Sequence, residues 1–161
     1  MIARESVRRV VDPLRSIFPG YHPDAADINE ALDLGVASCA VRAFTAGLLL
    51  RQAFPNPTMY GVEYGFDKQH GGEYLGENGS YLLMGHAVVR LTTPAGFTHV
   101  VESDKRGTFA VVSPDEIHDR YAWEGLLEGY QDYLAQADMG EVEIDPAEVL
   151  TVVERRLSVL A

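Results

Sequence analysis

The residues of this chain that could carry out chemistry are a cysteine, a histidine and two acids, in that order along the sequence. Cys39 is the only cysteine and follows Ser38 at the start of an apolar stretch. His86 lies in a second apolar run, and Glu102 and Asp104 come after the next turn. Thiol catalysis needs a nucleophile, an imidazole that holds or takes its proton, and a third group that orients the imidazole. The sequence contains a candidate for each role.

Cys39 is predicted to lie in the first turn of a helix. Ser38 is a suitable N-cap, and the apolar residues after it recur with helical period until Pro55. Unpaired backbone N–H groups and the positive end of the helix dipole favour a thiolate over a thiol at this position. We therefore expect a reactive thiol. The alternative is a small buried hydrophobic residue, which is what most free cysteines are.

His86 and the two acids are predicted to meet through the pairing of two strands, 81–92 and 97–103. Because side chains alternate along a strand, Glu102 and Asp104 share one face, and either could reach His86. Glu102 is preferred, since Asp104 also begins an Asp-Lys-Arg-Gly turn. Taken singly, the histidine also fits a buried core residue, and each acid fits a solvated strand end.

The elements that must position these residues follow one another in an order typical of an α+β domain. Apolar residues spaced by three and four predict helices, and aromatic and branched runs between turn residues predict strands. We expect helices over 7–18, 24–34 and 38–54, from 113–116 to about 135, and from 145 onward, and strands over 59–66, 81–92, 97–103 and 108–112. The glycine-rich stretch 67–80 is predicted to be a loop that could border a cleft. The order predicts an antiparallel sheet of about four strands packed against the Cys39 helix, with N- and C-terminal helices.

Composition limits the class of protein. The chain has 161 residues, of which 47% are hydrophobic, and this predicts one domain over 1–161. A net charge of −11 offers no attraction for nucleic acid or an anionic membrane, so neither is an expected partner. Charged residues interrupt 1–18, which argues against a signal peptide, and no run reaches membrane-spanning length. One cysteine excludes an internal disulfide, and a reduced thiol suits the cytoplasm.

A metal site is a second way in which this chain could use its cysteine. Five histidines accompany it, namely His22, His70, His86, His99 and His118. No pair of these residues has the spacing of zinc ligands, and HExxH, CxxC and EF-hand patterns are missing. The glycines of the loop also lack the Walker lysine pattern and the following helix of a phosphate-binding loop. We therefore expect no metal and no cofactor.

Residues 35–112 resemble the papain-like and transglutaminase-like superfamily of cysteine enzymes. The stretches that resemble the nucleophile helix and the His-Ala-Trp-Val strand of bacterial transglutaminase-like proteases are Ser38-Cys39-Ala40-Val41-Arg42-Ala43-Phe44 with the following Leu48-Leu49-Leu50-Arg51, and Gly85-His86-Ala87-Val88-Val89. The leader peptidases of lasso-peptide biosynthesis share the small size and the Cys-x-x-Arg-Ala pattern. Val88 departs from that pattern because it replaces the tryptophan, and the common Trp-x-x-x-Asp setting of the third triad member is missing.

The resemblance implies a papain-like core, within 35–112, that acts on an amide bond of a peptide or protein through a thioester. Cys39 would attack the carbonyl, His86 would protonate the leaving amine, and Glu102 or Asp104 would orient His86. Backbone N–H groups at the start of the Cys39 helix would stabilise the carbonyl oxyanion, with a second donor not identified.

Two alternatives accompany this prediction. Hydrolysis is preferred over acyl transfer because water is the default acceptor, and nothing indicates an acyl-CoA or glutamine-donor pocket. A catalytically inactive protein-binding module on the same fold is the other class of function. Asn29 and Asp33 could line the site, but an exposed helix surface is the simpler account of both.

Overall fold

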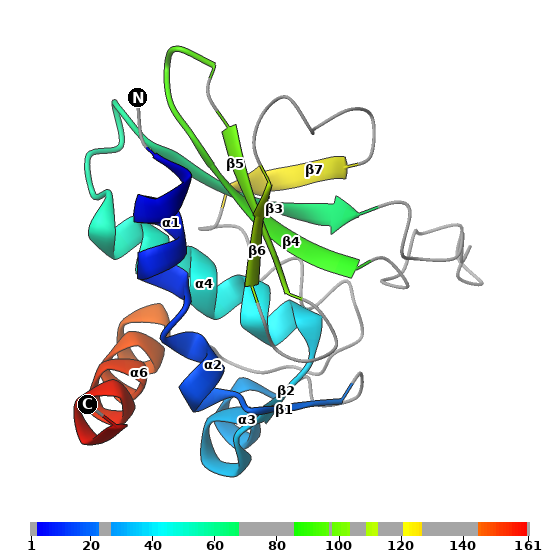
Figure 1. The fold of residues 1–161 in the computed structure, drawn as a ribbon, viewed down its shortest axis with the longest axis vertical. Coiled ribbons are helices and arrows are strands. Elements are labelled where there is room, and N and C mark those ends of the chain that lie inside the picture. Colours follow the sequence, from blue (N-terminus) through cyan, green and yellow to red (C-terminus); the bar gives the residue numbers. More distant parts are fainter. Residues whose placement is uncertain are drawn as a thin grey trace.

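The structure is a computed structural model that describes residues 3–22, 27–67, 86–96, 98–103, 109–112, 121–126 and 145–160. Over this part of the chain, helices cover one face of an antiparallel sheet (Figure 1), which confirms the expected α+β class. The described helices are α1 (Arg4–Val11), α2 (Leu14–Ile17), α3 (Ile28–Leu34), α4 (Cys39–Ala53) and α6 (Pro146–Leu160), and the strands are β1 (Gly20–Tyr21), β2 (Val36–Ala37), β3 (Gly61–Asp67), β4 (His86–Thr92), β5 (Thr98–Ser103), β6 (Phe109–Val112) and β7 (Tyr121–Leu126).

The helix that begins at Cys39 is the centre of the fold. Every residue of α4 from Ala40 to Leu50 is buried, including the polar Arg42 and Thr45, as expected for a helix whose apolar residues are spread around its circumference. The sheet lies along one side of α4, and α1, α2 and α6 pack on its other sides (Figure 1). The predicted packing of the cysteine helix on an antiparallel sheet is therefore confirmed, and the first turn of this helix has a fixed place in the molecule.

The large sheet has the strand order β6-β5-β4-β3-β7, and all its neighbouring strands are antiparallel. The first four of these strands match the four predicted from sequence. Of the predicted strand 81–92, residues 86–92 are described as β4. Residues 68–85, with most of the predicted loop, lie outside the described part, as do residues 104–108 with the predicted turn.

The fifth strand corrects the sequence prediction. Residues 121–126 form β7, although a helix was expected to continue through them to about 135. Tyr121 and Trp123 are two residues apart in β7 and pack in the same hydrophobic cluster. The backbone of β7 pairs with the edge of β3. Aromatic residues suit such a surface, and sheet pairing overrides the weak helix propensity of the segment. The remainder of the predicted helix lies outside the described residues.

The N-terminal helix is interrupted where one continuous helix was predicted. The apolar residues that repeat with helical period, Val7, Val11, Leu14 and Ile17, are all buried, but α1 ends at Val11 and α2 begins at Leu14. Pro13 explains the interruption, because proline lacks an N–H and crowds the preceding turn. The expected helices around α3 and α6 are present, and α6 begins at Pro146.

A short parallel pair, which the sequence did not predict, lies beside the start of α4. Gly20 and Tyr21 of β1 pair with Val36 and Ala37 of β2. Gly35 makes this possible, because it ends α3 with a φ of 69°, a left-handed conformation that suits glycine. As a result, Tyr21 lies next to Ala37. Ala37 precedes the candidate nucleophile, Cys39, by two residues.

None of the described helices is long and apolar enough to cross a membrane.

Candidate active site

Cys39 is the first residue of α4, as predicted. The hydroxyl of Ser38 caps the helix and accepts a hydrogen bond from the backbone N–H of Val41 at 3.4 Å. The cysteine side chain is half-buried and packs against a small cluster formed by Ala40, Ala43 and Ala87. Because these alanines carry only methyl groups, the start of α4 can approach β4 closely. Cys39 therefore contacts the strand at the residue that follows His86.

The pKa of the Cys39 thiol is raised, because the burial of the side chain disfavours the thiolate. Backbone N–H groups of Ala87, Ala40 and Cys39 itself act against this shift, as does the positive charge of Arg42. The expectation that the helix N-terminus favours a thiolate is thus wrong in its net direction. The predicted donors are present, but the loss of water around the sulfur outweighs them.

His86 and Glu102 come together as the sequence predicted. The Nε2 atom of His86 lies 3.5 Å from Oε1 of Glu102, and the two side chains retain only 16% and 10% of their exposure. Ala87 and Val101, their neighbours in the chain, face α4 and the main core. Alternation therefore puts His86 and Glu102 on the other face of the sheet. Asp104, the second candidate acid, lies outside the described residues.

Tyr121 is a member of this constellation that the sequence analysis missed. Its hydroxyl donates a hydrogen bond of 2.8 Å to Oε2 of Glu102. Tyr121 belongs to β7, so its side chain crosses two strands to reach β5. In the sheet register, Tyr121 lies opposite Asp67 of β3. The alternation of Tyr121 and Trp123 is a strand signal, which the helix predicted for this segment does not use.

Asp67 is a second residue that was missed. It is completely buried at the end of β3 and lies directly opposite His86 on one side and Tyr121 on the other. Residues paired in this way have their Cβ atoms about 5 Å apart on the same face of the sheet. Sequence reasoning treated Asp67 only as the first residue of a polar loop. Its register position makes it a neighbour of the candidate histidine.

Arg42 and Tyr21 border the other side of Cys39. Arg42 is fully buried, and its Nη2 atom donates to the carbonyl oxygens of Phe18 at 3.1 Å and Gly20 at 2.6 Å. The guanidinium carbon lies 5.6 Å from the centre of the Tyr21 ring. The arginine of the Cys-x-x-Arg-Ala pattern thus holds β1 against the first turns of α4.

Tyr21 is half-buried, and its phenol interacts electrostatically with the cysteine. Burial raises the pKa of Tyr21, the negative charge that Cys39 can carry raises it further, and the charge of Arg42 lowers it. A neighbouring negative charge has this effect only at short range in a partly desolvated setting. The phenol of Tyr21 is therefore protonated at neutral pH.

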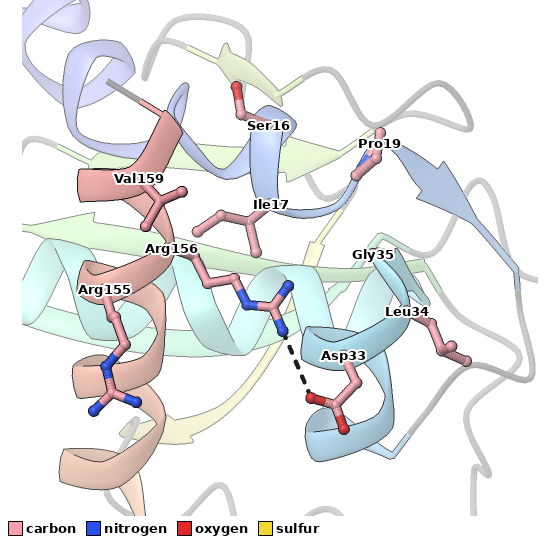
Figure 2. Close-up of a pocket in the computed structure, with 9 residues that line it drawn as sticks. All are labelled: Ser16, Ile17, Pro19, Asp33, Leu34, Gly35, Arg155, Arg156 and Val159. Carbon is pink, nitrogen blue, oxygen red and sulfur yellow. Dashed lines mark ion pairs between the residues drawn. The ribbon is translucent and has the colours of Figure 1, made fainter.

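A pocket of about 510 Å³ lies between α2, α3 and α6 (Figure 2). None of Cys39, His86 and Glu102 lines it. Asp33 does, and it pairs with Arg156 at 3.6 Å across the opening. Asp33 and Asn29 are both exposed on α3, which agrees with the simpler prediction that they belong to a helix surface.

Among the residues that the structure describes, no three histidine, cysteine, aspartate or glutamate side chains are grouped so that they could hold a metal ion.

Comparisons of the chain with protein-family models, with curated proteins and with solved structures find no match. The candidate site therefore has to be interpreted from its own geometry.

Proposed function

We propose that the protein is a cysteine-dependent hydrolase or acyltransferase that acts on an amide bond of a peptide or protein. One observation carries the proposal: the half-buried Cys39 at the start of α4 contacts Ala87, and the preceding residue, His86, pairs with Glu102. A thiol, an imidazole and a carboxylate are the three groups that thiol catalysis needs.

The reaction begins with the attack of the sulfur of Cys39 on the substrate carbonyl. His86 takes the thiol proton, a C–S bond forms, and the carbonyl electron pair moves to oxygen. The oxyanion collapses, the C–N bond breaks, and His86 gives the proton to the leaving amine. Water then attacks the thioester with His86 as base and releases the acid and the thiol. An amine in place of water gives acyl transfer.

Glu102 is the preferred orienting acid in this scheme. Its contact with Nε2 of His86 leaves Nδ1 as the nitrogen that exchanges a proton with the sulfur. His86 is the first residue of β4, so the ring has to reach past the strand end toward Cys39. The distance of 3.5 Å to Glu102 is long for a hydrogen bond, and catalytic contacts of this kind often shorten when substrate binds.

The raised pKa of Cys39 favours one version of this mechanism. Because burial keeps the thiol protonated at neutral pH, the proton has to move to His86 as the attack takes place. This is general-base catalysis rather than attack by a thiolate that exists beforehand. Substrate binding near the sulfur strengthens the need for a base, since it removes further water.

The resemblance to papain-like and transglutaminase-like enzymes supports a peptide or protein as substrate. The order of nucleophile helix, histidine strand and acid strand agrees with that group, and so does the packing of α4 on the sheet. Hydrolysis remains preferred over transfer. A reducing compartment such as the cytoplasm suits an enzyme that depends on its only thiol.

The test is turnover of a panel of peptidyl aminomethylcoumarin amides by the wild type and by three variants. Cys39→Ala should abolish release of the fluorophore. His86→Ala should lower kcat/KM by 100-fold or more, on the order of the contribution of a general base. Glu102→Gln, which keeps the shape but not the charge, should lower kcat with a smaller effect on KM.

His99→Ala is the matched control, because His99 is also buried in the sheet but lies on β5 opposite Leu91. It should keep near wild-type turnover if it folds, as judged by circular dichroism. Turnover that survives Cys39→Ala would overturn the proposal. If no amide or activated ester acylates Cys39 in the wild type, the inactive binding module becomes the better account.

A further inference from the structure

We propose that Tyr21 is a catalytic residue whose hydroxyl donates a hydrogen bond to the substrate carbonyl oxygen as it becomes an oxyanion. The inference rests on the proposed function and supplies the second oxyanion donor, which the sequence did not identify. The first donor in this scheme is the backbone N–H at the start of α4. Tyr21 comes from β1, which pairs with β2 just before the start of α4.

The position of Tyr21 is fixed from two sides. Its backbone pairs with Ala37, two residues before Cys39. Its ring lies against the guanidinium of Arg42, which is one helical turn after Cys39 and therefore on the same face of α4. The ring of Tyr21 is thus held beside the first turn of α4, which carries Cys39.

Arg42 and Gly20 hold the segment that carries Tyr21 in place. Arg42 is fully buried and binds two carbonyl oxygens of the segment that carries the ring, those of Phe18 and Gly20. Gly20 also lets the segment approach closely, since a Cβ there would come within 2.9 Å of the Val36 side chain. A buried cation costs desolvation energy, and the bonds that Arg42 makes here hold the short strand that carries Tyr21.

The chemistry of the phenol suits an oxyanion donor. Tyr21 is half-buried, so it is in reach of a ligand while partly shielded from water. Burial and the charge that Cys39 can carry raise the pKa of Tyr21, against a lowering by Arg42, so the hydroxyl keeps its proton at neutral pH. As the sulfur attacks and its proton passes to His86, negative charge develops on the carbonyl oxygen, and a neutral donor can stabilise it there without itself ionising.

The experiment compares two reactions of Cys39 in the wild type and in Tyr21→Phe. Alkylation by iodoacetamide displaces iodide and forms no oxyanion, whereas acetylation by p-nitrophenyl acetate passes through one. Intact-protein mass spectrometry follows the first reaction, and p-nitrophenol release with the mass of the acetyl-enzyme follows the second. Tyr21→Phe should acetylate about 100-fold more slowly, a typical loss for one oxyanion donor, while its alkylation rate stays within about twofold of the wild type.

Phenylalanine keeps the ring against Arg42, so the variant removes the hydroxyl alone. Tyr60→Phe is the control for loss of a phenol elsewhere and should leave both rates unchanged. If Tyr21→Phe is acetylated as fast as the wild type, the inference is wrong and the proposed function stands. If alkylation and acetylation slow together, Tyr21 only supports the fold around the sulfur, which also overturns the inference. If the wild type is alkylated but never acetylated, the proposed function itself fails.

Discussion

At the scale of single residues, the state of Cys39 at rest follows from a competition between burial and backbone donors. Burial wins and raises the pKa of the thiol. We expect the rate of alkylation by iodoacetamide to rise with a midpoint above that of an unstructured cysteine peptide measured alongside, because only the thiolate reacts. A midpoint below that of the peptide would mean that a preformed ion pair dominates.

The same shift makes stability depend on pH. Because the folded chain holds the thiol proton more tightly than the unfolded chain, the unfolded state loses this proton first as the pH rises. The free energy of unfolding should therefore fall as the pH passes above the ordinary range of a free cysteine. Cys39→Ala should lack this part of the fall, which urea titrations at several pH values would measure.

Tyr121 provides a second prediction at the residue scale. Its hydroxyl is the donor to Oε2 of the buried Glu102, so Tyr121→Phe leaves that oxygen without this partner. We expect a loss of about 1–3 kcal/mol in the free energy of unfolding and a lower kcat, because Glu102 then holds His86 less firmly. Urea denaturation and amide turnover test the two effects separately.

The control for Tyr121 is Tyr60→Phe. Tyr60 is half-buried, and the structure shows no hydrogen bond from its hydroxyl to a described residue, so its loss should cost much less. Equal stability of Tyr121→Phe and wild type would contradict the contact. If Tyr121→Phe is less stable but turns over substrate as fast as the wild type, the hydrogen bond from Tyr121 does not help Glu102 to orient His86.

At the scale of elements, Arg42 joins β1 to α4. Arg42→Met keeps most of the apolar volume but removes the donor to Phe18 and Gly20. Bonds from a charged donor are worth about 1.5–3 kcal/mol each, and the release of a buried charge recovers part of this. We expect a net loss of about 2 kcal/mol and a local opening of β1 from β2.

Hydrogen exchange can separate the local opening from global unfolding. The amide of Gly20 donates to Gly35 at 2.9 Å within this pair, and it should exchange faster in Arg42→Met than global stability alone explains. Leu50→Ala, which also lies buried on α4 but near its other end, should speed exchange at Gly20 only through global unfolding. Equal behaviour of the two variants would contradict the role of Arg42.

The elements show where sequence reasoning succeeded and where it could not. The start of α4 was predictable because Ser38, the apolar period and Pro55 are local signals. The meeting of His86 with Glu102 was also predictable, since it depends only on a hairpin between consecutive strands. By contrast, Tyr121 reaches Glu102 across two strands, and that contact depends on a pairing of β3 with β7 over a long stretch of chain.

The direction in which the pKa of the Cys39 thiol is shifted could not be predicted from the sequence, for a similar reason. A helix N-terminus can be recognised locally, but the alanines that exclude water from Cys39 come from both α4 and β4. Their distance from one another in the sequence gives no sign that they share one cluster. Burial is a tertiary property, and it decided the direction of the shift.

At the scale of the whole molecule, one hydrophobic cluster joins the N-terminal helices, α4, the inner face of the sheet and α6. Most of the predicted core can be read from the periodic apolar residues, and the helix at the C-terminus contributes Val149 and Val153 to it. A side-chain contact between Gln52 and Glu154 also connects α4 to α6. A single cluster of this kind predicts one cooperative unit over the described residues.

This cooperativity can be tested with a variant in α6 and a reporter in the sheet. Val153→Ala removes a side chain that is 1% exposed and should cost about 1–3 kcal/mol through lost burial and the cavity left behind. The only tryptophan is Trp123, on β7, so its fluorescence reports the sheet while circular dichroism reports mainly the helices. Both urea transitions should move together to lower urea. The exposed Ser158→Ala on the same helix should move neither. If Val153→Ala shifts the dichroism alone, α6 unfolds by itself, and the chain is not one cooperative domain.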